Sequence, residues 1–392
     1  MDEIWVLGAT GRTGRAIAAR LAAEGAPLVL VGRDAGRLDT VAAEVGGMSR
    51  TVVIGRAGGR HGGATDTAGT SGTSGSSGTI GTTGTAGTVA AIAEALGAAG
   101  RPAVVVNTIG PFTETAVPIA RACPPGTHYL DLANELRAVS GLLDLHAEAA
   151  ADGRCLVTGA GFGVLATESV VLKMCAGRPA PVRVRVDALP AAGGRSGPVG
   201  AALAASVVDA IAVGGRRYER GRLVRARLGG DFARFTLPDG SAAHSAGGPS
   251  GELAAAHRAS GAPFVVAASG MMPTGRVLRA VLPTAARLLA WRPLGAAVKR
   301  RFARVQAEPA ERRREFSWAR ALVRDADGRS RTGWLRTGDG MGFTAAVTAE
   351  VALRLARGQG KPGAHTPGAL FGPELAEAAG AVFLLDEPHP GP

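Results

Sequence analysis

The chain has 392 residues, of which 46% are hydrophobic, and this is enough to bury the cores of two domains. Its formal net charge of +12 comes from 44 basic residues, nearly all of them arginine, while only 4% of the residues are aromatic. Because single-stranded nucleic acid is usually bound on aromatic platforms, this composition argues against a nucleic-acid partner.

The sequence also argues against a membrane-spanning or metal-binding protein. No apolar run reaches the roughly 18 residues that a transmembrane segment needs, and the first residues run directly into a strand pattern rather than a signal peptide. Three widely spaced cysteines and seven scattered histidines form no disulfide framework and no metal-ligand motif. We therefore expect a cytoplasmic protein without a bound metal.

Strand and helix patterns alternate over residues 1–165. The strand patterns cover residues 3–8, 28–32, 51–55, 103–112, 127–135 and 154–159. Helical periodicity separates them, which is typical of an α/β fold with a Rossmann doubly wound parallel sheet. The alternation is interrupted at residues 56–88, where glycine falls at every third position without the proline that a collagen helix needs. We predict a disordered Gly/Ser/Thr-rich insertion there, followed by a helix over 89–96.

The pattern changes after residue 166. Residues 182–189 alternate apolar and polar side chains, as in a sheet with one solvated face. Further strand patterns at 222–228, 232–237 and 263–268, and a hairpin at 316–336, predict a second, mixed α/β domain over 166–340 for substrate binding or dimerisation. Residues 341–392 are predicted to form helices that return to the Rossmann domain.

The segment GATGRTG spaces Gly8, Gly11 and Gly14 between the first predicted strand and the first predicted helix. Such glycines let the backbone turn tightly and let a pyrophosphate approach the amide groups at the positive end of the helix. The spacing is G-x-x-G-x-x-G rather than G-x-G-x-x-G. Its position in the strand–helix pattern favours dinucleotide binding over a purely structural turn.

The end of the second strand indicates which dinucleotide is bound. An acidic residue there would bind the ribose hydroxyl of NAD, whereas an arginine pairs with the additional phosphate of NADP. The strand ends at Gly32 and is followed by Arg33, and Arg12 can reach the same region. We therefore predict NADP, with Asp34 either opposing this choice or capping the next helix.

Residues at the carboxyl ends of the later strands are candidates for the reaction site. Asn107, Thr108 and the backbone through Gly110 and Pro111 are expected to border the nicotinamide. The candidates for a proton donor or substrate anchor are Tyr129, Asp131 and Glu135. The alternative is a hydrogen-bonded interior role for Tyr129 and helix capping for the two acids. The Tyr–Lys pair of common short-chain reductases is absent, because neither tyrosine has a lysine four positions later.

Several segments together resemble the saccharopine dehydrogenase-like oxidoreductases. They are GATGRTG, VGRD, VVVNTIGPF, ACPPGTHYLDLANE and GAGFG over the first 170 residues, and RTGDGMGFTAAVTAEVALRLA and HTPGALFGPEL near the end. The resemblance implies a Rossmann domain, an inserted mixed α/β domain and often a homodimer. It also implies that Thr10 and Thr13 join the glycines and Arg33 at the cofactor.

The resemblance leaves the substrate open. One branch of the family transfers hydride to the C=N bonds of amino dicarboxylates, and another, the trans-acting enoyl reductases, reduces the C=C bonds of acyl chains. Residues 277–305 favour an acyl substrate, an acyl carrier protein or a membrane surface, since apolar positions lie among arginines. These positions are Leu278, Val281, Leu282, Leu288, Leu289 and Trp291. Ordinary packing helices explain the pattern as well, and an NADP-binding sensor without catalysis is the alternative of another class.

Overall fold

The computed structural model describes residues 2–55, 84–98, 101–191, 197–198, 201–272, 284–286, 288–289, 291–307 and 314–385. Most of the predicted insertion, residues 56–83, lies outside these ranges. The remainder of the insertion, residues 84–88, was assigned wrongly, because helix α3 begins at Thr85. Gly87 costs this helix only about 1 kcal/mol relative to alanine, which the other helix-forming residues of α3 can offset.

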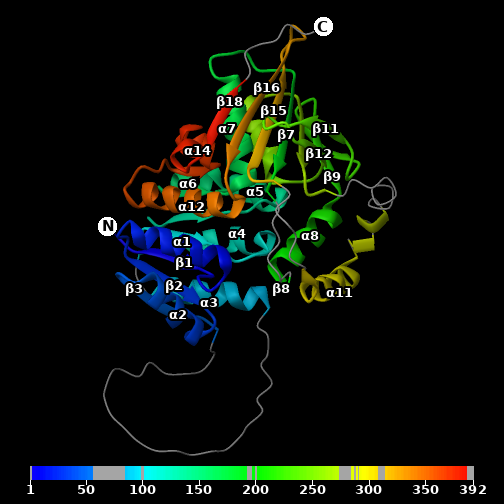
Figure 1. The fold of residues 1–392 in the computed structure, drawn as a ribbon. Coiled ribbons are helices and arrows are strands. Elements are labelled where there is room, and N and C mark those ends of the chain that lie inside the picture. The colour runs from blue at the N-terminus through cyan, green and yellow to red at the C-terminus, as the bar shows by residue number, and fades with distance from the viewer. Residues whose placement is uncertain are drawn as a thin grey trace, which may run out of the picture.

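A seven-stranded parallel sheet occupies the lower half of Figure 1, with the strand order β17-β6-β5-β4-β1-β2-β3. Its strands are β1 Ile4–Leu7, β2 Leu28–Gly32, β3 Ser49–Val53, β4 Val104–Asn107, β5 His128–Asp131, β6 Cys155–Val157 and β17 Gly363–His365. This confirms the predicted doubly wound parallel sheet, and the strand order reverses between β1 and β4. The seventh strand comes from the C-terminal segment and was not predicted.

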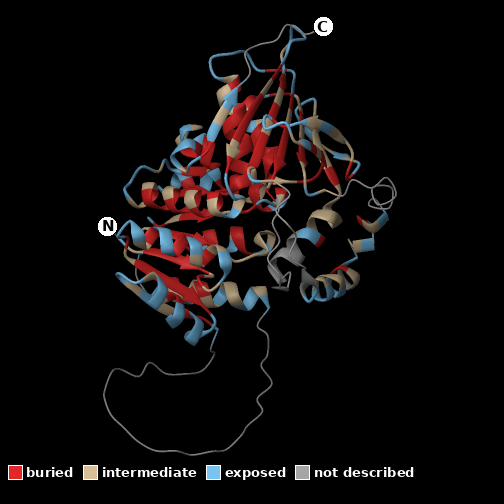
Figure 2. Cartoon of the chain, viewed as in Figure 1, coloured by how far each residue is buried: buried red, intermediate tan, exposed pale blue. Residues whose placement is uncertain are grey.

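Helices cover both faces of this sheet. The side chains of Ile4 and Val6 belong to one buried cluster and those of Trp5 and Leu7 to another, so β1 is buried on both sides. One face carries α1 Arg12–Ala23, α2 Ala35–Val45 and α12 Gly340–Ala356; the other carries α3 Thr85–Ala98, α4 Phe112–Ala122, α5 Leu136–Leu143 and α6 His146–Ala151. The interval between β5 and β6 thus holds two helices, α5 and α6. Figure 2 shows the buried strands between helices whose outer sides are exposed.

A second, mixed sheet of nine strands lies above the first in Figure 1, with the main order β10-β9-β13-β7-β15-β16-β18. Its strands are β7 Arg183–Leu189, β9 Gly215–Glu219, β10 Arg222–Ala226, β11 Ala233–Thr236, β12 Ala242–Gly247, β13 Phe264–Ser269, β15 Ser317–Arg324, β16 Ser330–Thr337 and β18 Val382–Leu385. Strands β7 and β13 are parallel and the other pairs are antiparallel. The predicted second sheet and its 316–336 hairpin are therefore present.

Helices α7 (Phe162–Cys175) and α9 (Gly251–Ser260) pack on the inner face of the second sheet. Two further helices, α8 (Ala201–Val213) and α11 (Arg292–Ala303), lie beside α4 in Figure 1, near the short strands β8 (Gly197–Pro198) and β14 (Gln306–Ala307).

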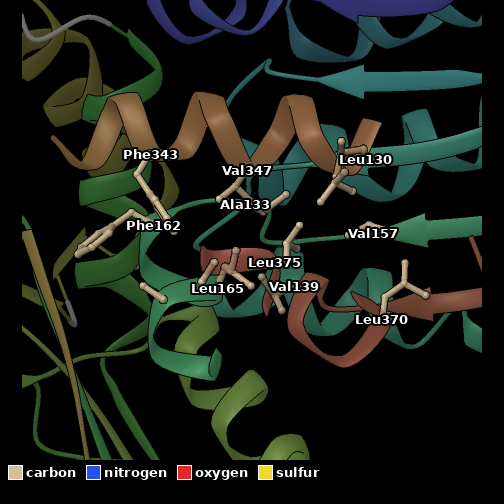
Figure 3. Packing of buried hydrophobic residues seen from close by; sticks show 14 of the residues in the cluster. Leu130, Ala133, Val139, Val157, Phe162, Leu165, Phe343, Val347, Leu370 and Leu375 are labelled. Atoms are coloured by element: carbon tan, nitrogen blue, oxygen red, sulfur yellow. The ribbon is translucent and has the colours of Figure 1, made fainter. Parts of the chain in front are cut away.

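One hydrophobic core runs from the first sheet to the second. Figure 3 shows Val347 of α12 beside Ala133, which follows β5, and Phe343 of the same helix beside Phe162. The rings of Phe162 and Phe343 meet edge to face, with their centroids 6.2 Å apart. Helix α12 therefore packs on β4 and β5 of the first sheet and on α7, the helix that covers the second sheet.

The buried carboxylate of Glu168 on α7 fixes the C-terminal segment. It accepts hydrogen bonds from the backbone amides of Gly368 (2.9 Å) and Ala369 (3.2 Å), and from the hydroxyl of Thr366. These groups form the N-terminus of α13 (Pro367–Phe371), which α14 (Glu374–Ala378) follows. A carboxylate at a helix N-terminus is favourable in both hydrogen bonding and charge. Burial nevertheless raises the pKa of Glu168 to about 7.

Candidate functional site

The glycine turn between β1 and α1 is packed so tightly that a side chain larger than that of glycine does not fit at Gly8 or Gly14. Gly8 has a φ of +79°, which favours glycine, and a Cβ on Gly14 would lie 2.4 Å from the carbonyl oxygen of Gly8. Helix α1 begins after Gly11, where no side chain caps the helix and the first turn carries no acidic residue. The amides of this first turn are thus available to an anion such as a pyrophosphate.

The end of β2 brings basic side chains to the same edge. Arg33 follows the strand and is exposed, as is Arg12. Asp34 is the N-cap of α2, because its carboxylate accepts a hydrogen bond of 3.0 Å from the amide of Arg37. The carboxylate thus has the capping role that the sequence left open. The guanidinium of Arg37 donates to the carbonyl of Thr10 at 3.3 Å, so this arginine, which sequence analysis missed, also lies at the turn.

The loop after β4 is held by a buried amide. Asn107 donates through Nδ2 to the hydroxyl oxygens of Thr115 (3.3 Å) and Tyr129 (3.0 Å), and its Oδ1 accepts from the amide of Ile109 at 2.9 Å. Thr108 donates to the carbonyl of Leu7 at 2.7 Å, which joins the ends of β4 and β1. Asn107 and Thr108 therefore position the loop that borders the glycine turn, and that loop continues through the cis Gly110–Pro111 peptide into α4.

Tyr129 and Asp131 are completely buried at the end of β5. The tyrosine hydroxyl donates to Asp131 Oδ2 at 3.0 Å, and Oδ1 accepts from Thr158 and from the amides of Ala133 and Gly159 at 2.8–3.1 Å. Burial raises the pKa of Asp131 to about 6 and that of Tyr129 well above its ordinary value. Neither side chain has exposed surface, which fits the interior role weighed for Tyr129 and gives Asp131 a similar one.

Glu135 lies where the loop after β5 meets the second sheet's helices. It is half-buried, and its carboxylate accepts from the amide of Asn134 at 3.1 Å. Its backbone forms an antiparallel bridge with Ser250, and the amide of Gly251 donates to the carbonyl of Asn134 at 2.8 Å. Of the three predicted catalytic residues, Glu135 is the one that keeps exposed surface.

Glu252 has a buried carboxylate beside the contact between residues 134–135 and 250–251, and sequence analysis missed it. Glu252 on α9 accepts a hydrogen bond of 3.3 Å from the side-chain Nδ2 of Asn134, and burial raises the pKa of Glu252. Residues 134 and 252 are far apart in the sequence and carry no shared motif, so the pairing has no local signal.

A cleft of about 1290 Å³ opens beside the first turn of α4 and is closed on the other side by α8, α11 and strands β9 and β10. Thr113 and Glu114, which directly follow the loop after β4, form part of its wall. Six basic residues line it: Arg137, Arg216, Arg225, Arg227, Lys299 and Arg300. Apolar lining comes from Ala212, Val213, Leu228, Leu289 and Ala296. The cleft therefore combines a basic side with an apolar wall.

The apolar segment 277–305 is only partly described. Leu278, Val281 and Leu282 lie outside the described residues, while Leu289 lines the cleft. Leu288 and Trp291 are exposed. Among the described residues, no helix is long and apolar enough to span a membrane. In the same part of the chain, no group of three or more His, Cys, Asp or Glu side chains is arranged to hold a metal.

No model of a known protein family matches the chain. A curated relative, the trans-acting enoyl reductase of Mycobacterium leprae (strain TN), is 42% identical over 66 residues. This match covers 16% of the present chain and 16% of the relative, so the chain spans only a small part of that protein.

The fold of the chain has a counterpart among solved structures. Apo saccharopine dehydrogenase (L-Glu forming) from Saccharomyces cerevisiae matches with a TM-score of 0.55 at 13% identity, over 97% of this chain and 96% of that chain. A short-chain dehydrogenase from Sphingobium yanoikuyae in complex with NADPH covers 40% of this chain and 71% of its own, with 16% identity and a TM-score of 0.29. The first match extends over both sheets, and the fold that the sequence resemblance implied is confirmed: this chain has the fold of saccharopine dehydrogenase.

Proposed function

We propose that the protein is an NADP(H)-dependent oxidoreductase that reduces a C=C or C=N bond of a substrate held in the cleft. The observation that carries this proposal is the uncapped N-terminus of α1. It follows a glycine turn in which a Cβ on Gly8 or Gly14 would clash with neighbouring atoms. Such a terminus suits the pyrophosphate of a dinucleotide. The bound nicotinamide would supply the hydride, so the protein needs only to position the acceptor and exclude water.

Individual residues have distinct roles in this proposal. Gly8, Gly11 and Gly14, with Thr10 and Thr13 between them, form the pyrophosphate turn. Arg33, with Arg12 and Arg37 nearby, pairs with the 2′-phosphate that distinguishes NADP from NAD. The Asn107–Tyr129–Asp131 hydrogen bonds hold the loop from Thr108 to Pro111 in place beside the nicotinamide. Tyr129 and Asp131 then act as positioning residues rather than as proton donors.

Two observations favour an acyl substrate. The cleft has an apolar wall that includes Val213, Leu228 and Leu289, and the relative with local sequence identity is named a trans-acting enoyl reductase. The basic residues of the same cleft suit a carboxylate-bearing substrate as well, which keeps an imine-reducing amino-acid dehydrogenase as the second candidate.

The test combines cofactor binding with turnover. NADPH and NADH are titrated against the protein by fluorescence, and NADPH oxidation is followed with a panel of enoyl thioesters and of keto acid and amine pairs. We expect tight NADPH binding and oxidation with the enoyl thioesters. Oxidation with keto acid and amine pairs alone would favour the second candidate. Tight binding without turnover would favour a sensor, and the absence of nucleotide binding would refute the proposal.

The cofactor preference is tested with Arg33→Asp. Loss of a charge-assisted hydrogen bond costs about 1.5–3 kcal/mol, so NADPH affinity should fall by about 10- to 100-fold while NADH affinity changes far less. Arg20→Asp is the matched control, since Arg20 is exposed in the last turn of α1, away from the glycine turn. An equal loss of affinity for both nucleotides in Arg33→Asp would contradict the assignment.

A further inference from the structure

Two arginines of the cleft face each other across neighbouring strands. Arg216 of β9 and Arg225 of β10 are direct partners in the antiparallel register, and both line the cleft. Side chains at such positions share one face of the sheet with their Cβ atoms about 5 Å apart, and like charges there are destabilising. The fold therefore places two like charges opposite each other at the wall of this cleft.

A third guanidinium comes from the other side of the cleft. Arg137 lies in the first turn of α5, beside the first sheet, and lines the same space. The pKa of Arg216 is lowered, chiefly by burial and then by the positive charges of Arg225 and Arg137. Arg216 is thus close enough to both Arg225 and Arg137 for the positive charges to repel, although the three belong to different parts of the fold.

The acidic residues of the cleft do not neutralise this group. Asp209 is paired with Lys299, with 2.7 Å between Oδ1 and Nζ, and this pair joins α8 to α11. Glu114 lines the cleft too, yet within the described ranges neither it nor any other carboxylate comes within ion-pair distance of Arg137, Arg216 or Arg225. Arg216 donates to the carbonyl of Gly215 at 2.9 Å, which orients its guanidinium without removing its charge.

We propose that Arg137, Arg216 and Arg225 form a subsite for the phosphate or carboxylate oxyanion of the substrate, while the apolar wall of the same cleft contacts its hydrocarbon part. Guanidinium groups bind phosphate and carboxylate oxygens in a bidentate manner, and a ligand of this kind would offset the repulsion among the three. The inference rests on the proposed function, because it identifies the substrate class of the same cleft.

The oxyanion has two chemical sources that an experiment can separate. One is the phosphate of a pantetheine arm that carries an acyl thioester, and the other is the pair of carboxylates of an amino dicarboxylate. The probes are 4′-phosphopantetheine, pantetheine and glutarate, and their binding is measured by calorimetry. Saturating NADPH is present, so that the phosphate sites of the cofactor are already filled and the probes cannot bind there. We expect 4′-phosphopantetheine to bind at least about tenfold more tightly than pantetheine. Binding of glutarate alone would assign the subsite to dicarboxylates.

Single Arg137→Gln, Arg216→Gln and Arg225→Gln variants should each weaken the anion that binds by about tenfold. Arg222→Gln is the matched control, because Arg222 is exposed on the same strand β10 and does not line the cleft. It should change affinity by less than about twofold. Without any anion, Arg225→Gln should raise the melting temperature, since it removes the repulsive pair.

The result that overturns the subsite is unchanged anion affinity in all three cleft variants, or failure of the wild-type protein to bind either anion. The proposed function fails separately, if the wild-type protein binds no NADPH. Because NADPH affinity is recorded for every variant, the two failures are distinguishable.

Discussion

Replacing Gly14 by alanine should destabilise the protein, although alanine is the better helix former. The added Cβ would lie 2.4 Å from the carbonyl oxygen of Gly8 and 3.0 Å from Cα of Ala9, and both are backbone atoms that cannot rotate away. Alanine improves helix propensity by about 1 kcal/mol, whereas overpacking of this kind costs about 1–3 kcal/mol. Since the contact is severe, we expect a net loss of about 1–2 kcal/mol in the free energy of unfolding.

The same displacement should weaken cofactor binding, because it moves the first-turn amides of α1 relative to the turn. A loss of about 1.4 kcal/mol corresponds to tenfold weaker NADPH affinity. Urea denaturation followed by circular dichroism measures the stability, and a fluorescence titration measures the affinity.

Gly141→Ala is the matched control for this substitution. Gly141 lies within α5, and its added Cβ would meet Cγ2 of Val117 at 3.5 Å, an ordinary contact. This variant should be up to about 1 kcal/mol more stable than the wild-type protein and should bind NADPH equally well. If Gly14→Ala behaves like Gly141→Ala in both assays, the close crossing of turn and helix is refuted.

Three further changes test the electrostatics of the fold. Asp34→Ala should lower stability by about 1 kcal/mol through loss of the α2 cap while leaving the ratio of NADPH to NADH affinity unchanged; a changed ratio would place Asp34 at the cofactor. Asp187→Ala should cost about 3 kcal/mol in urea denaturation, because it leaves two largely buried arginines without their common partner, and a loss under about 1 kcal/mol would contradict this. Because the pKa of Glu168 is raised from 4.5 to about 7, its contribution to stability is complete below pH 4.5 and is lost as the pH rises to about 7, by about 3 kcal/mol. Glu168→Gln should flatten the melting temperature over this range, and an unchanged slope would show that another group titrates.

The first sheet was predictable because its signals are local. Strand β2 was predicted with its observed bounds, because a continuous apolar run between the end of a helix and a Gly-Arg-Asp turn is typical of a buried strand in a parallel sheet. The glycine turn was predictable for the same reason. The positive φ of Gly8 and the crowding at Gly14 both require glycine, so the residue types themselves indicate the turn.

The elements that were missed depend on contacts between distant residues. Strands β17 and β18 contain three and four residues, and each exists because a neighbouring strand offers an edge, β6 for one and β16 for the other. Neither segment continues the regular alternation of strands and helices that identified the equally short strands β1, β4 and β6. The site behaves similarly, because Tyr129 and Asp131 were located correctly at a strand end, yet their complete burial follows from the packing of several elements around them.

The two halves of the proposed site therefore differ in how the sequence encodes them. A pyrophosphate is bound by backbone amides, and the geometry of those amides requires glycine at fixed spacing, which leaves a motif. The substrate would instead contact side chains from α5, β9 and β10, whose arginines are separated by many residues and look like any others in a chain rich in arginine. What singles out Arg216 and Arg225 is their opposition across two strands, and that relation exists only after the chain has folded. The proposed cofactor thus rests on local sequence, whereas the proposed substrate class rests on which charges the fold brings together.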